Sequence, residues 1–319
     1  MPYDIVAIGS ATVDVFVTPA SKEIVKHHAH MDVCYHIGEK VLIKDIVTDT
    51  GGGGTNAAVA FARLGLRTGW LGVLGDDHNA ALIRDVLRKE HVAILGPTVR
   101  GMTGYSVIMV GLRHDRSILA YKGVNDQLWS APALSTRWLY CSSMLGSSFK
   151  TLVRVVRRAK AAGIRYAFNP SMYLARQGIA KLKTLIDDCD LLVLNKEEAA
   201  VLLGTSSMDV RGMLKRLQQH AKLVVITDGA AGAFATNGID MFTAVTRNVK
   251  VVETTGAGDA FASGVVAGLI ERNDLAWGLK CGLAQSESVI KYVGAKNKLL
   301  SCPALIKAAA KHTVRVEAL

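Results

Sequence analysis

The sequence predicts an α/β fold of three layers, in which a mostly parallel central sheet is flanked by helices and a small β-sheet projects as a lid. Short apolar runs typical of buried strands recur before stretches with helical periodicity, which is the pattern of a parallel sheet with crossover helices. Near the N-terminus the pattern changes to short alternating strands without long helices between them. Together these patterns predict a large core and a second, smaller sheet.

The core elements follow one another along the whole chain. The expected strands are Ile5–Ile8, Thr68–Leu74, Trp138–Cys141, Arg165–Phe168, Leu191–Leu194 and Leu223–Thr227. The expected helices are Thr55–Leu64, Asp77–Lys89, Lys150–Ala162, Lys196–Leu203, Asp209–His220 and Ala257–Ile270. Gly65, Gly163 and Gly204 directly follow three of these helices, where glycine suits the left-handed backbone that often ends a helix.

The lid is expected from two segments, about 12–50 and 98–125. Their residues alternate between polar and apolar, for example in Tyr105–Val110. Two hairpin-like blocks beside one strand–helix unit predict a sheet that projects over a substrate. Exposed strand edges on such a sheet predict that two lids pair in a homodimer.

Composition indicates one folded α/β domain over residues 1–319. Half of the residues are hydrophobic, a fifth are charged, and no low-complexity tract interrupts the chain. The net charge of +11 is spread along the chain and is explained as well by an anionic small substrate as by nucleic acid, and we expect no nucleic-acid partner. No apolar run reaches the roughly 18 residues that cross a bilayer, and no basic leader is recognisable, so we expect a cytoplasmic protein without a membrane partner.

The most informative motif is the run from Glu253 to Asp259, with the sequence ETTGAGD. It places the Asp259 carboxylate in the first turn of a helix. Gly256 and Gly258 let the main chain approach a ligand closely, and the partial positive charge of helix N-terminal amides suits a phosphoryl group. Asp259 is then positioned to act as a base. The alternative is a helix cap, but a cap prefers the residue before the helix.

A second glycine-rich motif, Gly51–Gly54, leads through Thr55 and Asn56 into another helix. Its backbone amides and the Asn56 side chain can hydrogen-bond a polyol. The motif has neither the Gly-Lys-Ser/Thr end of a phosphate loop nor the glycine spacing of a dinucleotide site. Taken alone, it is equally typical of a flexible turn.

Both glycine motifs, together with Asn195-Lys196-Glu197-Glu198 between them, resemble the ribokinase-like (PfkB) family of carbohydrate and nucleoside kinases in order and spacing. The resemblance covers nearly the whole chain, from Gly9 to Gly294. It implies a ribokinase-like core with a β-sheet lid, ATP at the C-terminal half, and a sugar beneath the lid.

The resemblance also implies the catalytic roles. Asp259 matches the general base that deprotonates the accepting hydroxyl, and Gly256, Ala257 and Gly258 match the anion hole around the transferred phosphoryl. Phosphoryl transfer needs in-line positioning, charge stabilisation and one proton acceptor, so these roles agree with the chemistry of the residues.

Nucleotide and metal positions are implied as well. Asn195 and Glu198 match a motif that holds Mg²⁺ and phosphate, with Glu198 acting through water. Ordinary helix capping by these two residues is the alternative. Thr227, Gly229 and Gly232 match the segment that lines the nucleotide. Glu253, which stands where aspartate is common, and Thr255 match a monovalent-cation site for K⁺.

The resemblance places the acceptor at Asp14, Gly52, Gly53, Asn56 and Asn125. A carboxylate after a strand can hold two adjacent hydroxyls, as sugars and ribosides require. We therefore expect a Mg²⁺-dependent kinase that transfers the γ-phosphoryl of ATP to a sugar or nucleoside. Two alternatives stay open: a kinase for a vitamin alcohol such as a pyridoxine or thiazole precursor, and a non-catalytic sugar-binding protein.

One further cluster, formed by His27, His28, His30, Cys34 and His36, contains residue types that bind transition metals. It lies in the expected lid and lacks a helical i,i+4 pair, so we interpret it as part of a lid strand or loop.

Overall fold

The computed structural model describes residues 2–20, 23–26, 31–110 and 116–319. Within these residues, ten strands form one sheet, sheet A, in the order β16-β15-β14-β13-β12-β11-β10-β1-β6-β7. The seven strands from β13 to β7 in that order pair in parallel, and β14, β15 and β16 add antiparallel strands at one edge. The mostly parallel sheet is therefore confirmed.

The elements that make up the core have the following bounds. The strands of sheet A are β1 (Tyr3–Ile8), β6 (Thr68–Leu71), β7 (Ala93–Ile94), β10 (Thr136–Cys141), β11 (Arg165–Phe168), β12 (Leu191–Asn195), β13 (Val224–Thr227), β14 (Ala233–Thr236), β15 (Asp240–Ala244) and β16 (Val314–Ala318). The helices are α1 (Gly53–Arg63), α2 (His78–Lys89), α3 (Gly146–Ala161), α4 (Ser171–Ala175), α5 (Gly178–Ile186), α6 (Lys196–Leu203), α7 (Val210–Leu217), α8 (Ala257–Arg272), α9 (Leu275–Val289) and α10 (Cys302–Ala309).

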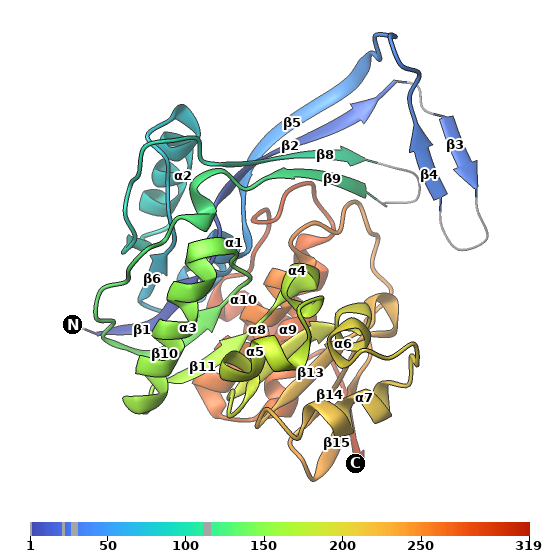
Figure 1. Cartoon of the computed structure of the whole chain (residues 1–319). Coiled ribbons are helices and arrows are strands. Elements are labelled where there is room, and N and C mark those ends of the chain that lie inside the picture. Colours follow the sequence, from blue (N-terminus) through green and yellow to red (C-terminus); the bar gives the residue numbers. More distant parts are fainter. Residues whose placement is uncertain (1, 21–22, 27–30, 111–115) are drawn as a thin grey trace.

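Helices cover both faces of sheet A, as Figure 1 shows. Alternate side chains of the central strands point to opposite faces, because successive residues of a strand do so. Ile5 and Ala7 of β1 pack in one apolar cluster with α1, α8 and α9, whereas Val6 and Ile8 pack in another with α3, α5, α6 and α7. Each face thus has its own hydrophobic core, and the three layers follow.

A second, smaller sheet projects from the core (Figure 1). This sheet B has the order β5-β2-β8-β9, formed by β2 (Thr12–Pro19), β5 (Ile43–Gly51), β8 (Gly104–Val110) and β9 (Arg116–Tyr121). The short strands β3 (Glu23–Lys26) and β4 (Met31–Cys34) pair with each other beyond it. Both segments expected to form the lid supply strands of sheet B, and the exact lid boundaries stay a prediction.

Most expected elements are present, with shifted ends. Helix α1 begins at Gly53, two residues before the expected start, because Gly54 packs against the backbone of Gly9 and continues the helical turn. Helix α3 begins four residues early, at Gly146. Helix α7 ends at Leu217, three residues before the expected end, and β6 ends at Leu71.

Candidate active site

The site lies where the parallel strands of sheet A end. Asn195 ends β12, Thr227 ends β13, and Gly256 directly precedes α8. Side chains from these ends surround a cavity of about 210 Å³. Its lining residues are Arg116, Asn169, Ser171, Val193, Leu194, Asn195, Glu198, Thr227, Thr254, Gly256, Gly258 and Asp259. Carboxyl ends of parallel strands are the usual place for ligands in such folds.

Asp259 stands in the first turn of α8 but does not cap the helix. The N-cap is Gly256, with a left-handed φ of 76° and no side-chain cap. The Asp259 Oδ2 atom instead accepts a 2.8 Å hydrogen bond from Nδ2 of Asn56 in α1, 203 residues away in sequence. Burial raises the pKa of Asp259, while the Asn56 hydrogen bond and the charge of Lys296 act in the opposite direction. The carboxyl group is thus better suited to accept a proton than an ordinary surface aspartate.

The glycines before α1 bring the two helix starts together. Gly52 has a φ of 94°, and a Cβ atom on it would lie 2.5 Å from the Ser10 carbonyl oxygen. A Cβ atom on Gly53 would lie 3.3 Å from Asp259 Oδ1. Only residues without a side chain allow this approach, so the N-terminus of α1 lies beside the Asp259 carboxylate.

Gly258 has no comparable packing reason to be glycine. No neighbouring atom lies within 4 Å of the position where its Cβ would be, and the residue lines the cavity. Glycine at the start of α8 therefore leaves open space at the helix N-terminus, where backbone amides attract an anion.

Asp14 and Asn125 are both buried near the start of sheet B. Asp14 accepts a 2.8 Å hydrogen bond from Thr12 Oγ1, and burial raises its pKa, opposed by hydrogen bonds from Thr12 and Ser106. The Asn125 side chain accepts from the Ala11 amide and donates to the Ala11 carbonyl, both at 2.9 Å. Asn125 therefore holds the loop between β1 and β2 that leads to Asp14.

Asn195 and Glu198 form a reciprocal capping box at the start of α6. The Glu198 amide donates to Asn195 Oδ1 at 2.7 Å, and the Asn195 amide donates to Glu198 Oε2 at 3.0 Å. The capping geometry is thus real, yet both residues also line the cavity. Burial raises the pKa of Glu198, and the nearby Asp259 charge acts in the same direction.

The three residues at and after the end of β13 that were predicted to line the nucleotide do not all line the cavity. Thr227 lines the cavity, whereas Gly229 and Gly232 belong to the tight turn between β13 and β14. Gly232 has a φ of 99°, and a Cβ on it would lie 2.1 Å from the Ala244 carbonyl oxygen. The turn geometry therefore accounts for this glycine, and nucleotide contact by both glycines stays a prediction.

Glu253 and Thr255 lie together behind the start of α8. Glu253 is 4% exposed, and its Oε1 atom accepts hydrogen bonds from the Thr255 amide at 2.7 Å and hydroxyl at 2.6 Å. Within the described part of the chain, the buried Oε2 atom of Glu253 has no hydrogen-bond partner. A buried carboxylate oxygen without a donor is costly unless a cation or water meets it.

Three residues of the site carry no signal in a sequence motif. Arg116 reaches the cavity from β9, where it donates to Thr254 Oγ1 and lies 3.9 Å from Glu253. Ser171 has a left-handed φ of 52°, and in the described residues its buried Oγ has no hydrogen-bond partner. Lys296 is 5% exposed and bonds Asn56. Only the tertiary fold brings these side chains together, so sequence spacing could not reveal them.

The histidine-rich segment provides no metal site that can be described. His27, His28 and His30 lie outside the described residues. Among the residues that are described, no group of three or more histidine, cysteine, aspartate or glutamate side chains could hold a metal ion.

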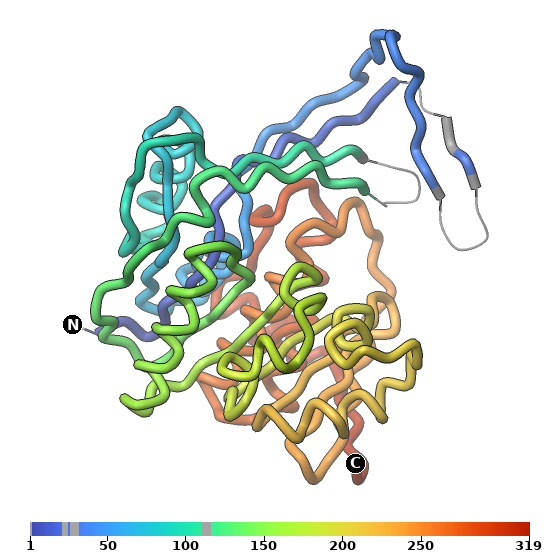
Figure 2. Tube along the Cα trace, in the orientation of Figure 1, coloured from blue at the N-terminus to red at the C-terminus, as the bar shows by residue number. Residues whose placement is uncertain are grey.

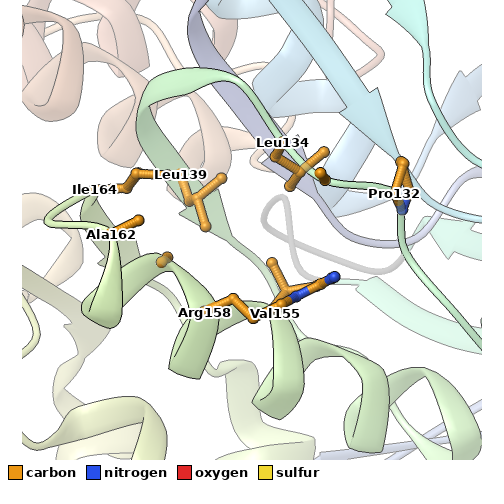
Figure 3. Close-up of a pocket in the computed structure, with 9 residues that line it drawn as sticks. Pro132, Leu134, Leu139, Val155, Arg158, Ala162 and Ile164 are labelled. Atoms are coloured by element: carbon orange, nitrogen blue, oxygen red, sulfur yellow. The ribbon is translucent and has the colours of Figure 1, made fainter.

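A second hollow, of about 190 Å³, lies at the opposite ends of the strands, between α3 and the loop before β10. Figure 3 shows Leu134, Leu139 and Val155 around it, together with Arg158. Apart from the Arg158 guanidinium, its lining side chains are apolar. It lacks the groups that phosphoryl transfer needs.

Residues 4–302 match the family model described as pfkB family carbohydrate kinase. The chain belongs to the pfkB family. A 5-dehydro-2-deoxygluconokinase of Bacillus licheniformis is 26% identical to it over 308 residues, covering 90% of each chain. The solved ribokinase of Arabidopsis thaliana, in complex with ribose and ATP, has a TM-score of 0.80 at 22% identity, covering 97% of this chain and 99% of the ribokinase.

A solved nucleoside kinase of Burkholderia thailandensis, in complex with inosine, has a TM-score of 0.76 at 19% identity and covers 96% of this chain and 97% of its own. The ribokinase-like fold is thus confirmed, and this pfkB chain is a sugar or nucleoside kinase of a family that uses ATP. In the part of the chain that is described, no helix combines the length and apolar character needed to span a membrane.

Proposed function

We propose that this pfkB kinase transfers the γ-phosphoryl of ATP to a hydroxyl of a sugar or nucleoside, with Asp259 as the general base. One observation carries the proposal: the Asp259 carboxylate lies at the junction of two glycine-rich helix starts, hydrogen-bonded to Asn56 and open to a polar cavity. A base beside an anion-binding helix N-terminus is what transfer to an alcohol requires.

The residues around the cavity have separate roles in this proposal. The backbone amides around Gly256, Ala257 and Gly258 hold the transferred phosphoryl. Asp259 accepts the hydroxyl proton as the new oxygen–phosphorus bond forms and the bond from the γ-phosphorus to the bridging oxygen breaks, which releases ADP. Asp14, Asn56 and the backbone of Gly52 and Gly53 hold the acceptor. Thr227 and the turn with Gly229 and Gly232 lie along the nucleotide.

Metal ions fit two places. Glu198 and Asp259 put two carboxylates around one cavity. A Mg²⁺ ion held at Glu198 through water would relieve their mutual repulsion, because Mg²⁺ takes oxygen ligands and retains several waters. The unpartnered Glu253 Oε2 beside Thr255 suits a monovalent cation such as K⁺. When bound, Mg²⁺ neutralises phosphate charge, and K⁺ fixes the loop before α8.

Sheet B serves as the lid over the acceptor and as the homodimer surface in this proposal. Asp14 and Asp49 are paired on β2 and β5, so they share the face of sheet B on which Lys296 approaches. Leu119 and Tyr121 stand on the opposite face, 60% and 55% exposed. If neither ATP nor the acceptor changes amide hydrogen exchange in β2 and β8, that result would count against sheet B as a lid.

An ADP-release screen tests the proposed activity. The wild-type enzyme is assayed with Mg-ATP against pentoses, hexoses, sugar acids, inositols and nucleosides, with and without K⁺. The proposal predicts acceptor-dependent ADP release that requires Mg²⁺, and a sugar or nucleoside monophosphate as product. ADP release that stays at the acceptor-free level with every sugar and nucleoside, but rises with pyridoxine or a thiazole alcohol, would overturn it.

A further inference from the structure

A buried lysine lies directly behind Asn56 and Asp259. Lys296 belongs to the segment between α9 and α10, which the red trace of Figure 2 shows beneath sheet B. Its Nζ atom donates to the Thr50 carbonyl at 2.6 Å and to Asn56 Oδ1 at 2.7 Å. A lysine is almost never this buried without a specific set of partners.

The main chain of Lys296 is also held in place. Its carbonyl oxygen accepts a 2.7 Å hydrogen bond from Arg63 Nη1, and Arg63 is fixed by two hydrogen bonds to Glu90, of 2.9 and 2.5 Å. The ammonium group therefore reaches Asn56 from an anchored position, and the side chain need not search for its partner.

The chemistry of an ammonium group decides how Asn56 is oriented. An asparagine amide presents an acceptor oxygen at one end and a donor nitrogen at the other, whereas lysine only donates. Lys296 can therefore pair only with Oδ1 of Asn56. The Nδ2 end must then face Asp259, where it donates to Oδ2 at 2.8 Å.

This arrangement selects one oxygen of the base. Because Oδ2 of Asp259 already accepts the hydrogen bond from Asn56, Oδ1 is the oxygen better placed to accept a proton. Oδ1 faces Gly53, since a Cβ there would lie 3.3 Å away, and Gly53 belongs to the proposed acceptor site. The direction in which Asp259 accepts a proton thus depends on the orientation of Asn56.

The charges around Lys296 support this assignment. Acidic residues face it from three elements, Asp14 from β2, Asp49 from β5 and Asp259 from α8, and Arg63 faces it from α1. The Lys296 ammonium group thus faces three carboxylates and does not form a structural ion pair with any single one of them.

We propose that Lys296 is a positioning residue for phosphoryl transfer: by holding Asn56 Oδ1, it turns Asn56 Nδ2 toward Asp259 and leaves Asp259 Oδ1 to take the acceptor proton. This inference rests on the proposed function of Asp259. It adds a role for a residue that contacts the base only through Asn56.

The test compares Lys296→Met, which cannot donate, with Lys296→Gln, which has similar size and keeps an N–H donor. Lys291→Met, an exposed change at the end of α9, is the matched control. The panel acceptor that gives the highest wild-type rate is used. We expect Lys296→Met to lower kcat roughly 10- to 100-fold with the acceptor KM within about 3-fold, since misplacing a reacting group costs that much.

Lys296→Gln should recover at least about 5-fold of that loss, and Lys291→Met should match the wild type. In the Asn56→Ala background, Lys296→Met should have no further effect on kcat, because its partner is gone. Wild-type kcat in Lys296→Met, or a raised KM with unchanged kcat in both Lys296 variants, would overturn the inference. The latter would assign Lys296 to acceptor binding.

Crystal structures separate this inference from the proposed function. If the wild type phosphorylates no acceptor, the function fails, but the orientation of Asn56 is still testable. Lys296→Met should lose the 2.8 Å contact between Asn56 Nδ2 and Asp259 Oδ2, with the rest of the fold intact. Retention of that contact would contradict the positioning role.

Discussion

At the scale of single residues, Gly258 shows how a small side chain serves the site rather than the fold. It is a helical residue with no atom near its missing Cβ, so packing does not require glycine. We predict that Gly258→Ala leaves stability unchanged or raises it by about 0.5–1 kcal/mol, because alanine is the better helix former. Its methyl group enters the cavity, so kcat should fall at least about 10-fold.

Thermal unfolding and steady-state kinetics check this prediction together. Gly264 is a useful contrast on the same helix, because a Cβ there would lie 2.6 Å from the Cys281 carbonyl oxygen. Gly264→Ala should therefore destabilise the protein. Loss of stability in Gly258→Ala, with full activity in the folded fraction, would argue that Gly258 is structural.

Lys296 should make the free energy of unfolding depend on pH. Burial lowers the pKa of Lys296 from the ordinary 10.5 to about 8. The unfolded chain keeps this proton up to about pH 10.5, so unfolding takes up a proton between pH 8 and 10.5. Raising the pH through that window disfavours unfolding, and the wild type should gain roughly 3 kcal/mol relative to Lys296→Met.

Urea denaturation of both proteins at pH 7.5 and pH 10.5 measures this gain directly. Comparison with the variant cancels the titration of other groups, as long as both chains unfold in the same way. An equal difference in free energy of unfolding at the two pH values would mean that Lys296 keeps its proton in the folded protein.

At the scale of elements, sequence patterns predicted the helices that begin at the candidate site better than the elements around them. Helix α6 has the predicted bounds, and α8 begins at the predicted Ala257, because glycines and caps mark their ends. Helix α9 was not among the helices predicted from the residue pattern, since it is buried on most sides and lacks a polar stripe. The antiparallel strands β14–β16 were also not predicted. The pattern used was one of strands alternating with helices, and no helix separates β14 from β15.

The site itself was predictable to the extent that it lies in local motifs. Asp259, Asn56 and the two glycine runs stand in short motifs, and the fold brings them together as the resemblance implies. Arg116 and Lys296 stand alone in the sequence and join the site only through β9 and the loop after α9. Such contacts depend on tertiary packing, which residue spacing does not encode.

The exposed face of sheet B is where we expect two chains to pair. Leu119 and Ile46 are 60% and 59% exposed, and the strand register puts both on the face opposite Asp14. If this face pairs two chains, Leu119→Glu should shift the protein from dimer to monomer, because a buried charge is costly. Sedimentation velocity measures the shift, with Lys181→Glu, an exposed position on α5 away from sheet B, as a control for added negative charge. A wild-type monomer at micromolar concentration would defeat the dimer.

At the scale of the whole molecule, the proposed reaction requires two halves of the chain to meet. The first half supplies sheet B, Asp14 and the start of α1, and the second supplies α6, α8 and the loop with Lys296. Asn56 and Asp259 join them across 203 residues of sequence. A fold that closes one cleft from such distant parts can couple acceptor binding to assembly of the catalytic groups.

The most direct measurement is kcat of Asp259→Asn beside the wild type, with Mg-ATP and the best acceptor of the screen. Asparagine has the same shape but cannot accept the hydroxyl proton, so we expect a loss of at least about 100-fold in a protein that folds normally. A wild-type kcat in Asp259→Asn would show that this carboxylate is not the base.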